Sequence, residues 1–337
     1  MLRPQVPFAR GGAEIFTDRL VDELRARDHD ADLVSVPFKW YPGARVLTQA
    51  FLWRMLDLDE ADGGRIDLVV ATKFPSYLVR HADKRVWLVH QFRQAYELDG
   101  TPLGQFGDAP AERALRRKVQ ELDRVALEEA SHVFTTSRNV ASRLETSTGL
   151  VAELLPHPPQ ELDYRCQGYE NFVLSVNRLD RAKRIDLLLE AAARDAHLEV
   201  VIAGEGPDRQ RLERLAHDRG LNGRARFTGR VSETELADLY ARCLAVYYAP
   251  VDEDYGMVPL EAFLSEKPVL TTTDAGGPLE VVSDHATGLV VTPEAEEIAR
   301  ALGWLREHRD EAAAFGRAGN AIAREVTWDR AIERLLA

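Results

Sequence analysis

Two glutamates separated by seven residues carry the clearest chemical pattern in the sequence. In APVDEDYGMVPLEAFLSEKPVLTTT, Glu253 precedes a predicted helix and Glu261 lies about one turn inside it, roughly 7 Å along the helix axis. The first amides of a helix have no partner within it and carry the positive end of its dipole, so those of Met257, Val258 and Leu260 are expected to bind an anion. Carboxylates beside an anion suit neutral hydroxyl groups, such as those of a sugar and a ribose. Taken alone, a capping carboxylate and a solvated helix face explain the two glutamates as well.

A pair of cations belongs to a second motif, NFVLSVNRLDRAKRIDLLLEA. This segment is predicted to run strand, turn, helix, with Arg178 at the end of the strand and Lys183 at the start of the helix. Ligands bind at the carboxyl edge of parallel sheets, where two cations can neutralise a diphosphate. The alternative is surface ion pairing with Asp180 or Asp186.

Two further loops follow predicted strands. HLEVVIAGEGPDRQ runs from a strand into a turn that begins at Gly204, but Arg209 takes the place of the third glycine of a dinucleotide fingerprint, which argues against NAD. FTGRV ends in a loop at Arg230 and Val231, before a helix with the capping-box sequence SETE. That loop could hold the edge of a base through its backbone; a plain connecting loop is the alternative.

The elements that must position these residues alternate between short β-branched runs and longer stretches of helical period, which predicts an α/β protein with parallel sheets. Pro156, Pro158 and Pro159 interrupt this alternation and indicate a linker. We therefore expect an N-terminal domain over residues 1–155, a C-terminal domain over 160–326 and a terminal helix over 327–337 that packs back toward the first domain. The predicted strands are 32–38, 67–73, 85–91 and 132–137, then 172–177, 198–203, 225–229, 245–249, 268–273 and 288–291.

The beginning of the chain departs from this pattern, because only Met1 and Leu2 precede the polar Arg3. The first strand of the first domain is therefore expected to be nearly absent. Arg3, Pro4 and Gln5 also interrupt any apolar core of a signal peptide.

Composition narrows the possible partners and location. With 43 basic and 55 acidic residues the formal net charge is −12, which argues against nucleic acid as a partner. Cys166 and Cys243 are far apart and suggest neither a disulfide framework nor a zinc site. No apolar run reaches the length of a membrane span, so a cytoplasmic protein is expected. Contact with the inner face of a membrane is the less favoured alternative, because acids interleave with the basic cluster of Arg113, Arg116, Arg117 and Lys118.

Taken in order, these motifs resemble the family-four retaining glycosyltransferases of the GT-B superfold. The resemblance spans essentially the whole chain: the glycines of PFARGGAE, the Arg178 and Lys183 pair, the AGEGP turn, the TGRV loop, and the E-x7-E motif from Glu253 to Glu261. It implies two Rossmann-like, doubly wound domains that face each other across a cleft.

The resemblance also implies roles for individual residues. Glu253 would hold hydroxyls of the transferred sugar, Glu261 would bind the ribose, and Arg178 and Lys183 would bind the diphosphate. The remaining donor residues would be Gly11 and Gly12 near the diphosphate, Gly204 in its turn, Arg230 and Val231 at the base, and the amides of Gly256, Met257 and Val258 at the sugar or distal phosphate.

The acceptor side is expected in the first domain. His90 ends a predicted strand at a position where the family often has a histidine that contacts the sugar or assists the acceptor; a structural histidine is the alternative. Arg93, Tyr96 and Trp40 are acceptor candidates because cations and aromatic faces suit phosphates and sugars, although a packed domain edge explains them equally well.

The function implied is a retaining hexosyltransferase of the kind that serves polysaccharide biosynthesis, with a UDP-sugar as first donor and GDP-mannose as second. The acceptor would be a glycan, a lipid-linked sugar or a small molecule. No metal or other cofactor is expected, because the two cations and a helix dipole can neutralise the leaving diphosphate. A phosphorylase of the same superfold would carry a pyridoxal phosphate lysine in a much longer chain. A sugar-nucleotide-binding protein that has lost turnover is the remaining alternative.

Overall fold

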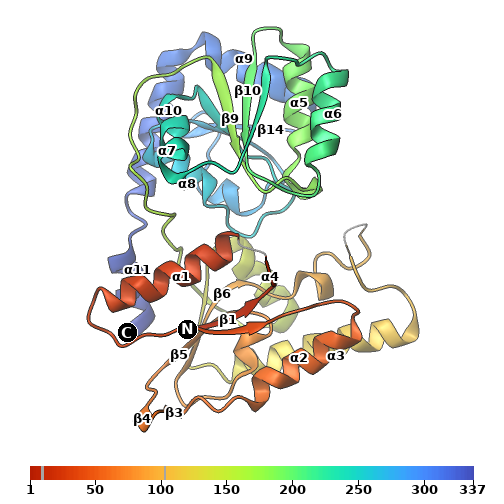
Figure 1. Ribbon diagram of the computed structural model, residues 1–337, viewed down its shortest axis with the longest axis vertical. Coiled ribbons are helices and arrows are strands. Elements are labelled where there is room, and N and C mark those ends of the chain that lie inside the picture. Colours follow the sequence, from red (N-terminus) through yellow and green to blue (C-terminus); the bar gives the residue numbers. More distant parts are fainter. Residues whose placement is uncertain (9–10, 102–103) are drawn as a thin grey trace. The chain divides into compact units, whose positions relative to one another are not determined.

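The computed structural model describes residues 1–8, 11–101 and 104–337, which form two compact units (Figure 1). The first unit comprises Met1–His157 together with Trp328–Ala337, and the second comprises Pro158–Thr327. Each unit is built on its own six-stranded sheet.

The sheet of the first unit is parallel throughout and has the order β2-β1-β5-β6-β7-β8. Its strands are β1 (Leu2–Gln5), β2 (Val34–Pro37), β5 (Val69–Lys73), β6 (Lys84–His90), β7 (His132–Thr135) and β8 (Glu153–Leu154). A short hairpin of β3 (Glu60–Ala61) and β4 (Gly64–Arg65) lies outside this sheet.

Strand β1 corrects the expectation of a nearly absent first strand. It has four residues and pairs with β2 on one side and β5 on the other. The polar Arg3 made this strand hard to recognise in the sequence. Its side chain donates to Thr17 at 3.0 Å and pairs with Asp18 at 2.5 Å, and both residues lie on the following helix. An arginine can occupy a largely buried strand when its charge is paired with a nearby carboxylate.

Helices cover both faces of this sheet. On one face Phe16 and Leu20 of α1 (Gly12–Arg25) pack with Trp328 and Leu335 of α11 (Trp328–Leu336), the terminal helix. The Phe16 ring lies edge-on to Trp87, with a centroid distance of 4.8 Å. The other face is covered by α2 (Ala44–Met55), α3 (Pro110–Glu128), α4 (Arg138–Thr148) and the 3-10 turn η1 (Ser76–Leu78).

The sheet of the second unit is also parallel, in the order β11-β10-β9-β12-β13-β14. Its strands are β9 (Phe172–Val176), β10 (Glu199–Ala203), β11 (Ala225–Gly229), β12 (Ala245–Tyr247), β13 (Val269–Thr272) and β14 (Gly288–Val291). Its helices are α5 (Ile185–Arg194), α6 (Arg209–Asp218), α7 (Glu233–Arg242), α8 (Val258–Leu264), α9 (Ala295–Glu307) and α10 (Arg309–Ala323).

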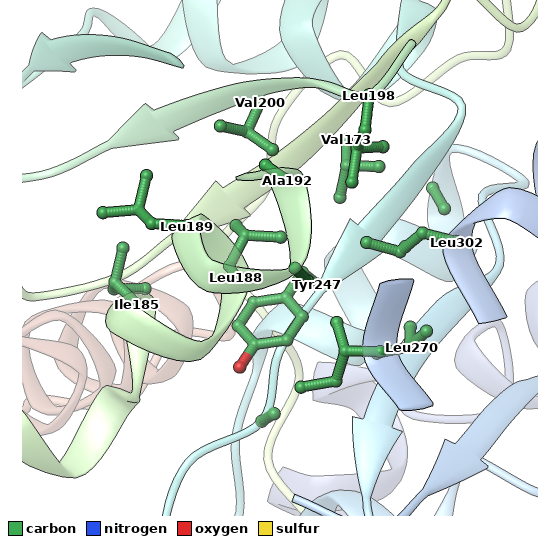
Figure 2. Packing of buried hydrophobic residues seen from close by; sticks show 14 of the residues in the cluster. Val173, Ile185, Leu188, Leu189, Ala192, Leu198, Val200, Tyr247, Leu270 and Leu302 are labelled. Carbon is green, nitrogen blue, oxygen red and sulfur yellow. The ribbon is translucent and has the colours of Figure 1, made fainter. Parts of the chain in front are cut away.

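The larger core of the second unit lies between its sheet and α5, α6 and α9. Figure 2 shows Leu188 of α5, Val173 of β9 and Leu302 of α9 converging around Tyr247 and Leu270. A second core on the opposite face of the sheet packs α7 and α8 against residues such as Leu174 and Val246. Helices on both faces of a parallel sheet make each unit Rossmann-like, which confirms the predicted α/β fold class.

The strand order of the second unit has one consequence for function. From β9 the chain proceeds to β10 and β11 on one side and then returns to β12 on the other, so β9 and β12 flank a topological switch point. Ligands of such sheets bind beyond the carboxyl ends of the strands at this point. In the described part of the chain no helix combines the length and apolar character needed to cross a membrane.

Candidate functional site

The segments that leave β9 and β12 meet at this switch point. After β9 the chain forms a 3-10 turn, η3 (Arg181–Lys183), whose first amides are capped by the Asp180 carboxylate, which accepts from Ala182 N at 3.1 Å. After β12 it turns at Pro250, and Val251 N donates to Ala182 O at 2.8 Å. This hydrogen bond joins the two loops and brings their side chains together.

Lys183 is held between an acid and an aromatic ring. Its Nζ donates to Oε2 of Glu253 and lies 5.7 Å from the centroid of the Tyr248 ring. The two charged side chains are only 17% and 23% exposed. Burial by itself would lower the pKa of Lys183, but Tyr248 and Glu253 outweigh it and raise the pKa above its ordinary value. Lys183 is therefore an ammonium ion at neutral pH, in a site with little access to water.

The loop that carries Glu253 is fixed through its backbone. Glu253 N donates to Ala275 O at 2.8 Å, and Gly277 N donates to Glu253 O at 2.8 Å. These bonds tie the loop after β12 to the loop after β13, so the Glu253 carboxylate is presented from a rigid frame.

Gly256 is required by the close packing that follows. Its φ is +80°, and a Cβ atom would lie 2.8 Å from the Tyr248 ring. Helix α8 begins two residues later, at Val258, with Met257 as its N-cap. The amides of Gly256, Met257 and Val258, which were expected to contact the sugar or distal phosphate, thus lie at the beginning of α8. Gly256 packs against Tyr248, the ring that Lys183 approaches.

Glu261 lies inside α8 and is 7% exposed. Its Oε2 accepts a hydrogen bond of 2.6 Å from the hydroxyl of Tyr240 on α7. Burial raises the pKa of Glu261, and the Tyr240 hydrogen bond opposes that effect. The structure therefore gives Glu261 a fixed orientation rather than a place on a solvated helix face.

The AGEGP turn supports the loop after β9 instead of presenting a side chain of its own. Gly204 has a φ of +136°, and a Cβ atom would lie 1.9 Å from Asn177 O; at Gly206 it would lie 2.2 Å from Leu179 O. Leu179 N also donates to Glu205 O at 3.0 Å. The two glycines let the loops touch, and their contact positions the residues on either side of Arg178.

The two arginines predicted to bind donor are both exposed. Neither Arg178 nor Arg230 forms an ion pair with an acid among the residues that the structure describes. Val231 is half-buried and packs against the core that includes Phe172 and Leu174. The cations are thus available to an anionic ligand, while Val231 fixes its loop.

In the first unit the glycine loop is engaged with an acid. Gly11 and Gly12 are exposed at the start of α1, and Gly11 N donates to Oε2 of Glu14 at 2.9 Å. The other Glu14 oxygen accepts from Lys73 Nζ, at the end of β5, at 2.8 Å. Burial would raise the pKa of Glu14, yet Lys73 and the Gly11 amide lower it overall. Two residues of the PFARGGAE motif, Ala9 and Arg10, lie outside the described residues.

Three of the acceptor candidates lie at or after the end of β6, whereas Trp40 follows β2. His90 is half-buried, and its Nδ1 is 2.6 Å from Gln91 O. Arg93 lies in the 3-10 turn η2 (Arg93–Ala95), and Trp40 packs edge-on against Tyr41 with a centroid distance of 5.4 Å. The Tyr96 hydroxyl donates to Oδ2 of Asp123 at 2.9 Å, so its hydrogen atom is already engaged by a residue of the same unit.

Helix α3 holds the segment that contains Arg93 and Tyr96. Arg116 Nε and Gln120 Nε2 both donate to Ala95 O, at 2.9 and 2.8 Å. Asp123 is fully buried and accepts from Tyr77 as well as Tyr96. Burial raises the pKa of Asp123 to about 7, against the opposing effect of the tyrosine hydrogen bonds.

The sequence analysis missed several partners at these sites. Tyr248, which directly follows β12, was detectable as an aromatic residue at the carboxyl end of a predicted strand. Lys73 was detectable in the same way, as a cation at the end of the predicted strand 67–73. Glu14 and Tyr240 lie within helices and carry no such signal.

Comparison with known proteins identifies the family of the second unit. Residues 164–321 match the model of glycosyl transferases group 1. The human alpha-1,3/1,6-mannosyltransferase ALG2 is 28% identical over 185 residues, which cover 50% of this chain and 44% of that protein. The GDP-mannose-dependent alpha-(1-6)-phosphatidylinositol monomannoside mannosyltransferase of Mycobacterium tuberculosis is 34% identical over 181 residues, 50% of this chain and 47% of that protein. The matched segment thus spans less than half the length of either curated relative.

Solved structures extend the likeness in fold to the whole chain. Sucrose-phosphate synthase from Thermosynechococcus elongatus has a TM-score of 0.76 at 20% identity, covering 99% of this chain and 96% of that one. Anabaena HepE in complex with UDP and glucose has a TM-score of 0.71 at 16% identity, covering 99% and 98%. Residues 164–321 thus match the group 1 glycosyltransferases, and the likeness in structure shows that the two units have the GT-B fold.

Proposed function

We propose that this chain is a retaining, metal-independent glycosyltransferase that moves a hexosyl group from a nucleotide-diphosphate sugar to a glycan, lipid-linked or small-molecule acceptor. The observation that carries the proposal is the charged Lys183, held between Glu253 and Tyr248 at the switch point of the second unit. A partly buried ammonium ion at this edge of a parallel sheet has the position and charge to bind a diphosphate.

The ion pair with Glu253 would be exchanged when the donor binds. Lys183 would turn toward the diphosphate, with the exposed Arg178 as a second cation, because a diphosphate carries more negative charge than one carboxylate. Glu253 would then accept hydrogen bonds from hydroxyls of the transferred sugar. In the absence of donor, the same acid limits the cost of keeping an ammonium ion in a half-buried site.

The nucleoside would extend toward Glu261, Arg230 and Val231. The support at Glu261 is that one carboxylate oxygen is fixed by Tyr240, which orients the group to accept hydrogen bonds from ribose hydroxyls. Backbone groups around Arg230 and Val231 would border the base. UDP is the first nucleotide to test, because the Anabaena HepE structure holds UDP and glucose, and GDP is the second, because the mycobacterial relative is GDP-mannose-dependent.

Chemistry would depend on charge that develops as the glycosidic bond breaks. The departing nucleoside diphosphate gains negative charge, so Lys183, Arg178 and the amides of Gly256, Met257 and Val258 would stabilise the transition state more than the ground state. The acceptor hydroxyl would attack from the face that the diphosphate leaves and give its proton to the leaving phosphate. His90, Arg93, Tyr96 and Trp40 of the first unit are the proposed acceptor-side residues.

Calorimetric titration of Lys183→Ala with UDP and with GDP tests the proposal. We expect affinity for the bound nucleotide to fall by about 10- to 100-fold, because a charge-assisted hydrogen bond contributes about 1.5 to 3 kcal/mol. The titrations are run in EDTA, since binding without a metal is part of the proposal.

Arg194→Ala is the matched control, because it removes a cation from the same unit whose ion pair with Glu190 lies on the surface of α5. Unchanged affinity in Lys183→Ala, or binding by the wild type that needs a divalent metal, would refute the assignment.

A further inference from the structure

Arg184 directly follows Lys183 and has a backbone conformation that arginine rarely adopts. Its φ is +50° and its ψ is 41°, in the left-handed region, at the junction between η3 and α5. This region is unfavourable for residues other than glycine. An arginine at such a position indicates that its side chain has a role that glycine could not fill.

The guanidinium of Arg184 forms a two-point ion pair with Asp274, in the loop after β13. Its Nη1 donates to Oδ1 at 2.7 Å and its Nη2 to Oδ2 at 2.6 Å, and the arginine side chain is only 18% exposed. Two parallel hydrogen bonds fix orientation as well as distance. These hydrogen bonds lower the pKa of Asp274 and raise the pKa of Arg184, so both groups are charged at neutral pH.

The backbone of Arg184 is held as well. The hydroxyl of Tyr247, the last residue of β12, donates to Arg184 O at 3.0 Å. The Tyr247 ring is buried in the larger core of the second unit, beside Leu188 and Leu270 (Figure 2). The start of α5 is therefore attached to β12 through the backbone of Arg184 and to the loop after β13 through its side chain.

Asp274 connects this ion pair to the loop that carries Glu253. Its carbonyl oxygen accepts from Asp252 N at 2.9 Å, and the neighbouring Ala275 O accepts from Glu253 N at 2.8 Å. The side chain of Asp274 thus holds Arg184, while its backbone holds the loop of Glu253. The ion pair of Arg184 and Asp274 is called the clamp below.

The clamp adds a second attachment to a backbone hydrogen bond between the loops after β9 and β12. In that bond Val251 N donates to Ala182 O at 2.8 Å. One hydrogen bond fixes a distance but lets the two loops rotate about it. Because Ala182 precedes Lys183 and Arg184 follows it, the clamp holds the chain on the other side of Lys183 and opposes that rotation.

We propose that the clamp keeps the loops of Lys183 and Glu253 at a fixed separation while a nucleotide sugar replaces the ion pair between them. The inference rests on the proposed function, in which Lys183 turns to the diphosphate and Glu253 to the sugar. Their direct ion pair is then lost, and the clamp remains. Arg184 and Asp274 are positioning residues, because they act through Lys183 and Glu253.

Calorimetry of Arg184→Gly with UDP, UDP-glucose, GDP and GDP-mannose tests the proposal. Glycine suits the left-handed backbone, so this variant loses the clamp and should remain folded. A free nucleotide needs only Lys183, whereas a nucleotide sugar spans both loops. We expect affinity for the nucleotide sugar to fall by about tenfold, because its hydroxyls lose Glu253, and affinity for the matching nucleotide to fall by less than about threefold.

Hydrogen–deuterium exchange of the unliganded chain gives a second measurement that needs no ligand. In Arg184→Gly the amides of Asp252 and Glu253 should exchange about tenfold faster, because their loop opens more often. Asp274→Asn loses the charge but keeps the backbone carbonyl, and should change exchange in the same direction. The amides of β10 should keep their wild-type rates.

Arg306→Gln is the matched control. Arg306 is 19% exposed and pairs with Asp195, the C-cap of α5, so the variant loses a similar ion pair at the opposite end of this helix. Nucleotide binding and exchange in the Glu253 loop should keep their wild-type values.

Two results would overturn the proposal for the clamp. One is an equal change, or no change, in the affinities for nucleotide and nucleotide sugar in Arg184→Gly. The other is unaltered exchange of the Glu253 loop in that variant. A wild type that binds neither UDP nor GDP would contradict the proposed function instead, while exchange would still report whether the clamp holds the loop.

Discussion

The candidate residues of the two units are held in different ways. In the second unit three of them are held by other side chains: Lys183 pairs with Glu253, and Glu261 accepts a hydrogen bond from Tyr240. In the first unit the segment that contains Arg93 and Tyr96 is attached to α3, a helix outside any of the recognised motifs. The family match, over residues 164–321, likewise lies within the second unit.

This difference indicates where the two halves of the proposed activity are specified. The donor half is a frame of loops in which Lys183, Glu253 and Glu261 have defined partners before any ligand binds. Arg178 and Arg230 are exposed at its edge. The proposed acceptor half depends on how α3 supports the segment after β6. We expect substitutions in the frame to affect nucleotide binding, and substitutions beneath the segment after β6 to affect the first unit alone.

The largest effect is expected from a substitution at Gly204, which should destabilise the second unit and leave the first unit folded. Gly204→Ala would place a Cβ atom 1.9 Å from Asn177 O at a φ of +136°. We expect the second unit to lose about 4 kcal/mol or more of stability, because the loops after β9 and β10 must separate. UDP binding should be lost as well. Calorimetry with UDP measures binding. Fluorescence reports mainly the first unit, which contains four of the five tryptophans, all but Trp304.

Gly220→Ala separates this clash from simple backbone strain. Gly220 also has a positive φ, +69°, but a Cβ atom there would meet nothing within 4 Å. The expected cost is about 1 kcal/mol, with UDP binding retained. Equal effects of the two variants would show that contact between the loops is not what holds the donor frame.

The next effect concerns Asp123 and the first unit. Its pKa is about 7 in the folded protein, against about 4 for an aspartate in an unfolded chain. Between these values the unfolded chain releases its proton while the folded protein keeps it. The free energy of unfolding should therefore fall as the pH rises from about 4 to about 7, by roughly 2 to 4 kcal/mol in total, and level off above that range.

Asp123→Asn should remove this part of the pH dependence, because an amide does not titrate and can still accept from Tyr77. Urea unfolding followed by tryptophan fluorescence, at about pH 5 and about pH 8, measures the difference between variant and wild type. Asp83→Asn is a control from the same unit, since its pKa is shifted in the opposite direction. If Asp123→Asn and the wild type lost stability in parallel, the buried carboxyl would not be the group responsible.

The comparison also explains how much of the fold was predictable. Alternating apolar runs predicted β5, β6 and β7 and all six strands of the second unit to within a few residues, because strands buried on both faces must be apolar. The capping box at Ser232 and Glu235 likewise begins α7 as expected. The two-residue β8 was missed, since Glu153–Leu154 has no periodicity to detect.

The site was predictable only where a single segment carries the chemistry. Lys183 and Glu253 were each identified from a local motif, but they are 70 residues apart, and nothing in either motif predicts that they form an ion pair. Glu14 and Lys73 are 59 residues apart and were missed altogether. Such pairs follow from strand order, which brings the ends of distant strands to the same edge of a sheet.

The smallest effect is expected at Tyr240, where a substitution should distinguish binding of the ribose from binding of the diphosphate. Tyr240→Phe removes the hydroxyl that donates to Glu261 and should raise the pKa of that acid further, which weakens it as an acceptor for ribose hydroxyls. We expect UDP affinity to fall by about fivefold, near 1 kcal/mol, with the affinity for inorganic pyrophosphate unchanged. Calorimetry with UDP and with pyrophosphate measures the difference between the two affinities.

The control is Tyr164→Phe, because the Tyr164 ring lies 6.2 Å from that of Tyr240 while its hydroxyl donates to Gln160 O. A similar loss for both ligands in Tyr240→Phe would place Glu261 at the diphosphate rather than at the ribose.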